Sequence, residues 1–378
     1  MNIQKKDIEE FIESNIDIYK DSESNLYQDL YDLYNITSNQ ENEKYVIKNI
    51  AYYCLQDEIE KQKIYNRRRK QLQKLKKLKL PDQRSPEWYA LRKKILTASS
   101  LETAIGHGHF QTKEELILSK IEEQPYISNE ITEWGVKYED VAIQFYEELC
   151  NVKVLDFGLV PHPEFDIFGA SPDGICEDTG NDEYIGRMVE IKCPPKRKFT
   201  KTVPGGYHMQ VQGQLEVCDL DECDFFQVKI IEYETIEDYH QDKFEIDGEL
   251  IEGRTNLNYP KGVTITYKIN DKLEYKYCKL NQSYNNLQKW IQSQDQENIH
   301  EIKWWKIERY ELTLVTRDKL WWIQNIEHIL SFYKELEYYK ENDNINLLKS
   351  KIEISKKKKK KFEQKPLNNF LLESDDDD

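Results

Sequence analysis

Hydrophobic residues in the stretch 1–80 recur at the spacing of an amphipathic helix, separated by polar and charged residues. The recurring positions are Phe11, Ile16, Ile18, Tyr19, Leu26, Leu30 and Leu33. Residues 66–80 continue as a basic helix or arm, and Pro81 ends it because proline disrupts a helix interior. We therefore expect residues 1–80 to form a helical extension that carries a basic segment at residues 61–80.

A second unit is predicted from Ser85 onward, because a serine N-cap followed by Pro86 is typical of a helix start. After Thr97 a turn leads into a second short helix. Apolar stripes at helical spacing predict further helices at residues 134–150, 207–217 and 317–339. Strands are expected at residues 152–160, 166–170, 188–193, 224–232 and 302–315, and a hairpin at residues 262–279 that turns at Asn270-Asp271.

Helices before and after a central sheet are typical of the α/β class, so we expect a mixed central sheet flanked by helices in a domain at residues 81–341. Within this domain, residues 240–300 extend beyond a minimal core and are interpreted as an insertion. Residues 342–378 are charged and low in complexity, which predicts a disordered C-terminal tail.

The charges along the chain are distributed in blocks. The formal net charge of −16 argues against nonspecific DNA binding by the chain as a whole. Residues 1–60 carry 14 acidic and 5 basic residues, whereas residues 61–80 carry ten Lys and Arg residues and no acid. A basic block is often a solvated helix face, but it can also contact phosphates. Both interpretations of residues 61–80 stay open.

The cysteine pattern indicates an intracellular protein with free thiols, because the number of cysteines is odd and no two are spaced as a metal-binding pair. The seven cysteines are Cys54, Cys150, Cys176, Cys193, Cys218, Cys223 and Cys278. No apolar run approaches the roughly 20 residues of a membrane span, and the N-terminus lacks a signal region. We expect an intracellular protein with no membrane partner; the sequence does not distinguish nucleus from cytoplasm.

The candidate chemistry lies in two short stretches, Ser171-Pro172-Asp173-Gly174 and Glu190-Ile191-Lys192-Cys193-Pro194. Alternate side chains of a strand share a face, so Glu190 and Lys192 point the same way and Asp173 can join them from a neighbouring strand end. Carboxylates suit Mg²⁺, and a lysine can orient water or stabilise charge on a phosphate. Solvated surface charges beside a turn would give the same pattern.

Two other segments supply further candidates. Glu139 lies in the first turns of a predicted helix. It is either a third metal-binding carboxylate or a surface residue that the helix dipole favours. Tyr207, Gln210 and Gln214 share one face of another predicted helix, which faces a site or the solvent.

Arg92 is followed by Thr97 and Ser99 at the start of a short helix. A guanidinium and hydroxyl groups at a helix N-terminus are suited to binding a phosphate. The alternative is an exposed arginine beside an ordinary helix cap.

In this order, the motifs resemble those of the phage lambda exonuclease family, also called YqaJ-like viral recombinases, within the PD-(D/E)XK nuclease superfamily. The matching residues are Trp88, Leu91, Arg92, Thr97–Ser99, Trp134, Gly135, Tyr138, Glu139, Ser171–Gly174, Glu190–Pro194, Tyr207 and Gln210–Gln212. The resemblance covers residues 84–235.

The resemblance implies a restriction-endonuclease-like core and a Mg²⁺-dependent enzyme, with Mn²⁺ able to substitute, that degrades duplex DNA from 5′ ends by two-metal hydrolysis. The implied metal ligands are Asp173, Glu190, Glu139 and the backbone carbonyl of Ile191. The implied catalytic residues are Asp173, Glu190, Lys192, Gln210 and Tyr207. Lys192 would position the attacking water and help to deprotonate it. The implied ligands of the 5′ phosphate are Arg92, Thr97 and Ser99.

The chain departs from the compact family pattern in its N-terminal extension, in residues 240–300, and in a long acidic gap between Asp173 and Glu190. We interpret this gap as a hairpin insertion. An endonuclease of the same fold and a non-catalytic DNA-binding scaffold therefore stay as alternatives to an exonuclease in recombination, repair or viral genome processing.

The tail contains a hydrophobic island that resembles the motif by which replication proteins bind a sliding clamp, with a leucine in place of the second aromatic residue. Its residues are Gln364, Leu367, Phe370 and Leu371. The expected partners are double-stranded DNA ends, a single-strand annealing protein and, through this tail, a sliding clamp.

Overall fold

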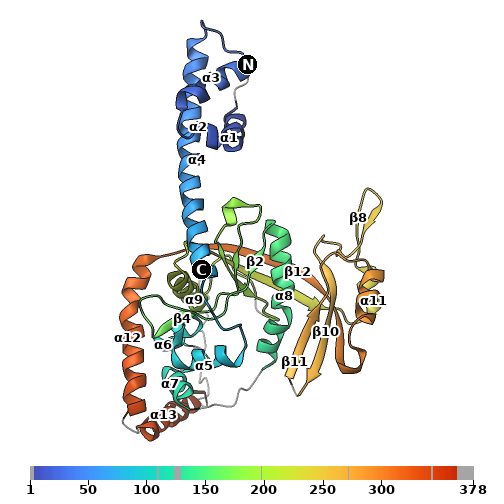
Figure 1. Ribbon diagram of the computed structural model, residues 1–378. Helices are drawn as coiled ribbons and strands as arrows, with labels where there is room; N and C mark the ends of the chain where they lie inside the picture. The colour runs from blue at the N-terminus through green and yellow to red at the C-terminus, as the bar shows by residue number, and fades with distance from the viewer. Residues whose placement is uncertain are drawn as a thin grey trace, which may run out of the picture. The chain divides into compact units, whose positions relative to one another are not determined.

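The structure is a computed structural model that describes residues 4–108, 110–122, 129–196, 198–270, 272–341 and 344–363. It divides into two compact units (Figure 1). The N-terminal unit comprises the residues up to Leu78 together with Glu177–Gly186, the acidic insert. The sheet unit comprises Lys79–Cys176 and the residues from Arg187 onward.

The N-terminal unit is helical, which confirms the prediction for the extension. Its helices are α1 (Lys5–Ser14), α2 (Ile16–Tyr19), α3 (Glu23–Leu33) and α4 (Glu41–Lys76). Apolar residues at i and i+4, Ile8 with Ile12 and Leu26 with Leu30, are fully buried against Leu55 of α4 and its neighbours. Residues 61–76 of the basic segment are the last part of α4, so they form a continuous helix rather than a separate arm.

The basic end of α4 is paired with the acidic insert, which includes the short helix η2 (Asp182–Tyr184). Arg69 lies 3.1 Å from Asp178 and 2.9 Å from Asp182, and Lys76 lies 2.7 Å from Glu177. The insertion predicted between Asp173 and Glu190 therefore provides carboxylates for the basic segment. These contacts favour a structural role for the two bases that they involve.

Substitution of Arg69 by glutamate is expected to release the acidic insert, because it replaces two attractions with two repulsions. Hydrogen exchange in Glu177–Gly186 should become faster, while global stability falls by at most about 1 kcal/mol, since such partly exposed pairs are weak. Lys70→Glu makes the same charge change one residue further along α4 and serves as the control. Equal exchange in the two variants would show that the pairs do not hold the insert.

The sheet unit is built on a seven-stranded sheet in the order β11-β10-β12-β7-β6-β5-β2. The strands are β2 (Val154–Leu155), β5 (Gly174–Cys176), β6 (Met188–Lys192), β7 (Glu222–Glu232), β10 (Lys261–Ile269), β11 (Lys272–Tyr277) and β12 (Ile299–Thr316). Only β6 and β7 pair in parallel, and the other neighbours are antiparallel. The sheet is therefore mixed, as predicted.

The strand expected at residues 152–160 is divided between two sheets. Its start forms β2, whereas its end forms β3 (Val160–Pro161) in a small sheet with β1 (Leu96–Thr97) and β4 (Phe168–Ala170). Between them Gly158 lies against the backbone of Pro81, where an added Cβ would be 1.9 Å from the carbonyl oxygen. The close approach of two backbones requires this glycine and interrupts the strand.

Helices surround the sheet, as the α/β prediction requires. They are α5 (Pro86–Lys94), η1 (Ala98–Ser100), α6 (Leu101–Ala104), α7 (Lys113–Ile121), α8 (Glu130–Cys150), α9 (Gly205–Cys218), α12 (Lys319–Glu341) and α13 (Ile345–Glu363). Helix α8 packs on β6 and β7, and α9 packs on β7 and the small sheet. Ser85 caps α5 by accepting a hydrogen bond from the Trp88 backbone N–H, as expected for an N-cap serine.

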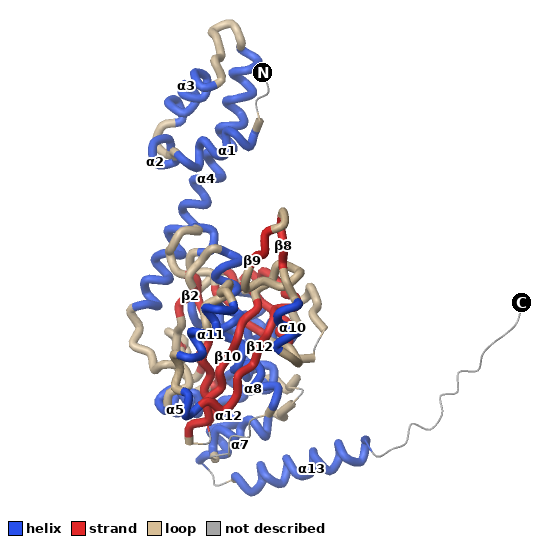
Figure 2. Tube along the Cα trace, turned by 90° about the vertical axis from the view of Figure 1, so that its right-hand side faces the viewer, coloured by secondary structure: helices blue, strands red, loops and turns tan. Residues whose placement is uncertain are grey.

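The segment predicted as an insertion extends the edge of the main sheet. It contributes the hairpin of β10 and β11, together with α11 (Tyr284–Gln292), η3 (Gln296–Asn298) and a second hairpin of β8 (Phe244–Ile246) and β9 (Glu249–Ile251). Figure 2 shows α11 and α10 (Ile236–Gln241) beside β10 and β12, and these elements share buried residues such as Tyr239, Ile265 and Leu287.

Helix α13 occupies part of the stretch for which a disordered tail was predicted. Leu348 and Ile352, at i and i+4, are buried, and α13 packs on α7 with an ion pair of 2.7 Å between Lys349 and Glu122. Amphipathic spacing within a lysine-rich sequence explains why composition alone did not reveal this helix. The residues of the clamp-like motif, 364–371, lie outside the described residues.

Candidate active site

Two adjacent antiparallel strands, β5 and β6, position Asp173 and Glu190. Asp173 comes directly before β5, and Glu190 lies in the middle of β6. The backbone N–H of Ile191 donates a hydrogen bond of 2.7 Å to Asp173 Oδ2, which joins the two motifs. At Gly174 an added Cβ would lie 2.1 Å from Val154, so only glycine lets β5 pass this close to β2.

Glu190 is fully buried, and three side chains satisfy its carboxylate. Lys192 and Gln210 both donate to Oε1, Gln210 at 2.7 Å, and Gln214 donates to Oε2 at 2.7 Å. A buried carboxylate without such partners would be strongly destabilising. The polar face of α9 therefore points at β6 and not at solvent. The Oε1 atom of Gln214 is buried without a hydrogen-bond partner among the described residues.

Lys192 is a cation held among carboxylates. Burial opposes its charge, but Glu190 and Asp173 outweigh that effect and raise the pKa of Lys192 above its usual value. Its Nζ atom lies 5.1 Å from the centre of the Tyr207 ring, which places Tyr207 beside the acidic residues. A protonated Lys192 can orient a water molecule or stabilise a phosphate, whereas accepting a proton requires the carboxylates to be engaged elsewhere.

Glu139 approaches the same centre from α8. Its Oε2 atom lies 3.0 Å from Nη2 of Arg84. Burial raises the pKa of Glu139, and the charge of Arg84 opposes this rise. Burial also raises the pKa of Asp173, with further contributions from the charges of Glu190 and Glu139. Three carboxylates thus repel one another in a shielded place.

The chemistry of this donor set fits a divalent cation, because three carboxylates and the Ile191 carbonyl are hard oxygen ligands whose repulsion a cation would relieve. In the described part of the chain, no three His, Cys, Asp or Glu side chains already surround one point as a metal cage. The positive charges beside these carboxylates come from two side chains. Lys192 contacts Glu190, and Arg84 contacts Glu139.

A second cluster contains the residues expected to bind phosphate. Arg92 Nη2 lies 3.2 Å from the hydroxyl of Ser99, which lies 3.2 Å from the hydroxyl of Thr97. Lys120, at the end of α7, donates to the backbone carbonyls of Arg92 and Ile95, the latter at 2.8 Å. Burial and then the nearby charge of Arg92 lower the pKa of Lys120 to about 8. Two cations and two hydroxyl groups thus lie in one region, and these are groups that can bind an anion.

This phosphate cluster is connected to the loop that carries Asp173. The guanidinium of Arg92 stacks on Trp88, 4.3 Å from the ring centre, and Trp88 Nε1 donates to the hydroxyl of Ser171 at 3.0 Å. Gln83 donates to the backbone carbonyl of Pro172 at 3.1 Å. The loop is therefore fixed by the segment that carries the phosphate cluster.

The sequence motifs did not identify three residues of this region. Gln214 was on the predicted polar face but not among the expected catalytic residues, and its i+4 spacing from Gln210 was the available signal. Arg84 and Lys120 contact their partners through tertiary structure, across 55 residues for Arg84 and Glu139 and across 28 for Lys120 and the Arg92 carbonyl. No local pattern indicates such pairs.

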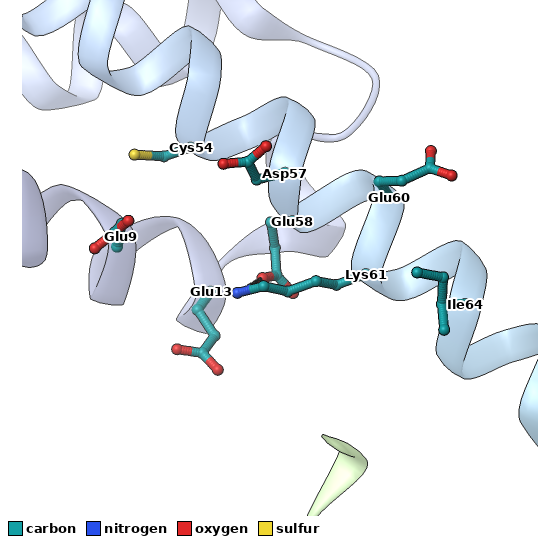
Figure 3. A pocket seen from close by; sticks show the side chains of 8 residues that line it. All are labelled: Glu9, Glu13, Cys54, Asp57, Glu58, Glu60, Lys61 and Ile64. Carbon is teal, nitrogen blue, oxygen red and sulfur yellow. Dashed lines mark ion pairs between the residues drawn. The ribbon is translucent and has the colours of Figure 1, made fainter. Parts of the chain in front are cut away.

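A large cavity lies elsewhere, within the N-terminal unit. It has a volume of about 460 Å³, and Figure 3 shows its lining. The lining residues are Glu9, Glu13, Cys54, Asp57, Glu58, Glu60, Lys61 and Ile64. It contains none of the candidate catalytic residues, and the chemistry of Asp173 and Glu190 lies in the sheet unit.

Comparison with known proteins finds a family match within the sheet unit. Residues 87–221 match the model of the YqaJ-like viral recombinase domain, which agrees with the resemblance drawn from the motifs. This domain contains Glu139, Asp173, Glu190 and Lys192 as well as Arg92.

The chain is also similar to two viral proteins. An uncharacterized protein of Acanthamoeba polyphaga mimivirus is 29% identical over 322 residues, which are 75% of this chain and 58% of that protein. A protein of African swine fever virus is 26% identical over 160 residues, which are 36% of this chain and 46% of that protein. The chain thus spans about half the length of the curated relatives that it matches.

Among solved structures, the alkaline exonuclease of Laribacter hongkongensis is similar at 20% identity and a TM-score of 0.41, with coverage of 70% of this chain and 99% of that one. A phage-related exonuclease from Haemophilus somnus has 14% identity and a TM-score of 0.33, with coverage of 64% and 92%. Among the described residues, no helix is both long enough and apolar enough to span a membrane.

Proposed function

We propose that the protein is a metal-dependent deoxyribonuclease that digests double-stranded DNA from 5′ ends, in recombination, repair or viral genome processing. The observation that carries this proposal is the convergence of Asp173, Glu190, Glu139 and Lys192 inside a YqaJ-like viral recombinase domain. A structural ion pair would need one acid and one base, whereas this centre gathers three acids, which Lys192 and Arg84 contact.

Asp173, Glu190, Glu139 and the Ile191 carbonyl are the residues that would hold Mg²⁺ or Mn²⁺. When bound, a pair of such ions supplies an activated water and stabilises the leaving oxygen. Gln210 and Gln214 fix the orientation of the Glu190 carboxylate. Lys192, as an ammonium group, orients the attacking water and balances charge at the scissile phosphate.

The phosphate cluster is the proposed site for the terminal 5′ phosphate. Arg92 offers a planar set of donors, Ser99 and Thr97 offer hydroxyl groups, and Lys120 adds a second charge. A terminal phosphate carries up to two negative charges near neutral pH, whereas a phosphodiester carries one. Two adjacent cations therefore favour a phosphorylated end over an internal position on the strand.

A linear duplex with one phosphorylated and labelled 5′ end, incubated with Mg²⁺ beside a closed circular control, tests the proposal. Release of mononucleotides from the phosphorylated end with the circle intact is the expected result. Cleavage of the circle would instead establish an endonuclease of the same fold. Binding without cleavage in both Mg²⁺ and Mn²⁺ would establish a DNA-binding scaffold.

Discrimination between phosphorylated and hydroxyl ends is expected to fall as the pH rises through about 8, the pKa of Lys120. Below this pH Lys120 is protonated and the cluster has two positive charges; above it only Arg92 keeps its charge. Arg92 on α5, Lys340 on α12 and the backbone carbonyls are the charged and polar groups that act on Lys120. The ratio of kcat/KM for the two ends, measured from pH 6.5 to 9.5, checks this, with Lys120→Gln as a pH-insensitive reference.

A further inference from the structure

Arg84 has a backbone conformation that is uncommon for a residue with a side chain. Its φ of 64° lies in the left-handed region. The residues on both sides hold this conformation, because Gln83 donates to the carbonyls of Phe157 and Pro172 and Ser85 caps helix α5. A conformation of this kind persists only where the surroundings impose it, and it is often found at functional sites.

The Arg84 side chain is directed at the acidic centre. Nη2 contacts Oε2 of Glu139 at 3.0 Å, and the side chains of Arg84 and Glu139 are 46% and 25% exposed. The charge of Arg84 acts on the carboxylates of Glu139, Asp140 and Asp156. One guanidinium thus partly neutralises three carboxylates.

A divalent cation at the proposed metal site would perform the same task for Glu139. The Arg84 guanidinium and a divalent cation would both bind the carboxylate oxygens of Glu139. In this structure the carboxylate contacts Arg84. In the described residues the acids do not form a ready cage, which agrees with this engagement. A metal ion at this site would therefore compete with Arg84 for the Glu139 carboxylate.

We propose that Arg84 is a positioning residue that holds Glu139 in the metal-free protein and is displaced from it by the divalent cation, so that Arg84 sets the affinity of the site for its metal. This inference rests on the proposed metal site. It identifies a residue outside the matched domain, which begins at residue 87, as a determinant of metal binding.

The test is calorimetric titration of the full-length, DNA-free protein with Mg²⁺ and, separately, Mn²⁺. Arg84→Gln is expected to tighten binding about 1.5- to 5-fold, the range for removal of a partly exposed charge pair. Arg84→Lys keeps the charge, and its metal affinity should lie between those of the wild type and Arg84→Gln. Lys94→Gln removes one positive charge from the exposed last turn of α5 and serves as the matched control, with unchanged metal affinity. Unchanged or weaker binding by Arg84→Gln would overturn the inference.

The Glu139→Gln background separates competition from a general charge effect. If Arg84 acts through Glu139, the tightening caused by Arg84→Gln should shrink when Glu139 is already neutral. Equal tightening in both backgrounds would refute a role through Glu139. Absence of any metal binding by the wild-type protein would overturn the proposed metal site together with this inference, whereas binding and cleavage by the wild type without an effect of Arg84 would overturn the inference alone.

Discussion

Replacement of Lys192 by alanine is expected to lower the rate of phosphodiester cleavage by about 10²–10⁴-fold, the usual contribution of a positioned group that handles protons or water. Lys192 contacts Glu190 with its ammonium group, and its raised pKa keeps it charged at neutral pH. Its removal deletes the group that orients water and balances phosphate charge, while Gln210 and Gln214 still hold the Glu190 carboxylate.

Affinity for DNA should change by less than about tenfold, because the loss is in the chemical step and not in binding of the duplex. Single-turnover cleavage and equilibrium binding, measured on the same labelled duplex, separate the two quantities. Lys229→Ala is the matched control, since Lys229 lies on the adjacent strand β7 and donates to the Pro195 carbonyl at 2.9 Å. Normal turnover by Lys192→Ala would contradict the assignment of this centre as catalytic.

The parts of the site that sequence could predict are those set by local geometry. Alternation in a strand places Glu190 and Lys192 on one face, and helical spacing places Gln210 and Gln214 together. The N-cap serine before Pro86 predicted the start of α5 correctly. Such features depend on neighbours within a few residues, so a single sequence contains all the information that they need.

The remainder depends on contacts between distant segments. The Arg84–Glu139 pair joins the segment before α5 to α8, and Lys120 joins α7 to the end of α5. No residue near either one signals its partner. Helix α7 was missed although Thr112 and Glu115 form a capping box, a pattern that the sequence does contain. The three-residue strand β5 is too short for alternation to be visible.

The charge blocks were visible in the sequence, but what the basic block contacts could not be predicted from them. The basic segment in α4 was visible in the sequence, and so was the acidic gap after Asp173. The opposite charges of the two blocks are compatible with a pairing between them. Composition alone does not distinguish this pairing from contact of the basic block with DNA phosphates. The distances between Arg69 and Asp178 and between Lys76 and Glu177 answer that question for these side chains.

Replacement of Arg92 by alanine is expected to lower digestion of 5′-phosphorylated ends by about 10- to 100-fold, the cost of losing a charge-assisted hydrogen bond of about 1.5–3 kcal/mol. Digestion of 5′-hydroxyl ends should change much less, because they offer no anion to the guanidinium. The variant should therefore still cleave DNA but should discriminate less between phosphorylated and hydroxyl ends. The ratio of kcat/KM for the two substrates is the quantity to measure.

Two controls separate phosphate binding from the structural role of the same side chain. Arg92 stacks on Trp88, which holds Ser171 near Asp173, so its loss could also disturb the acidic centre. A disturbed centre would slow digestion of both ends equally, and that outcome would contradict the phosphate role. Lys94→Ala removes a charge from the last turn of the same helix and should leave the ratio unchanged. Because Lys120 remains in Arg92→Ala, a residual preference for phosphorylated ends that disappears above pH 8 would assign the second charge of the cluster to Lys120.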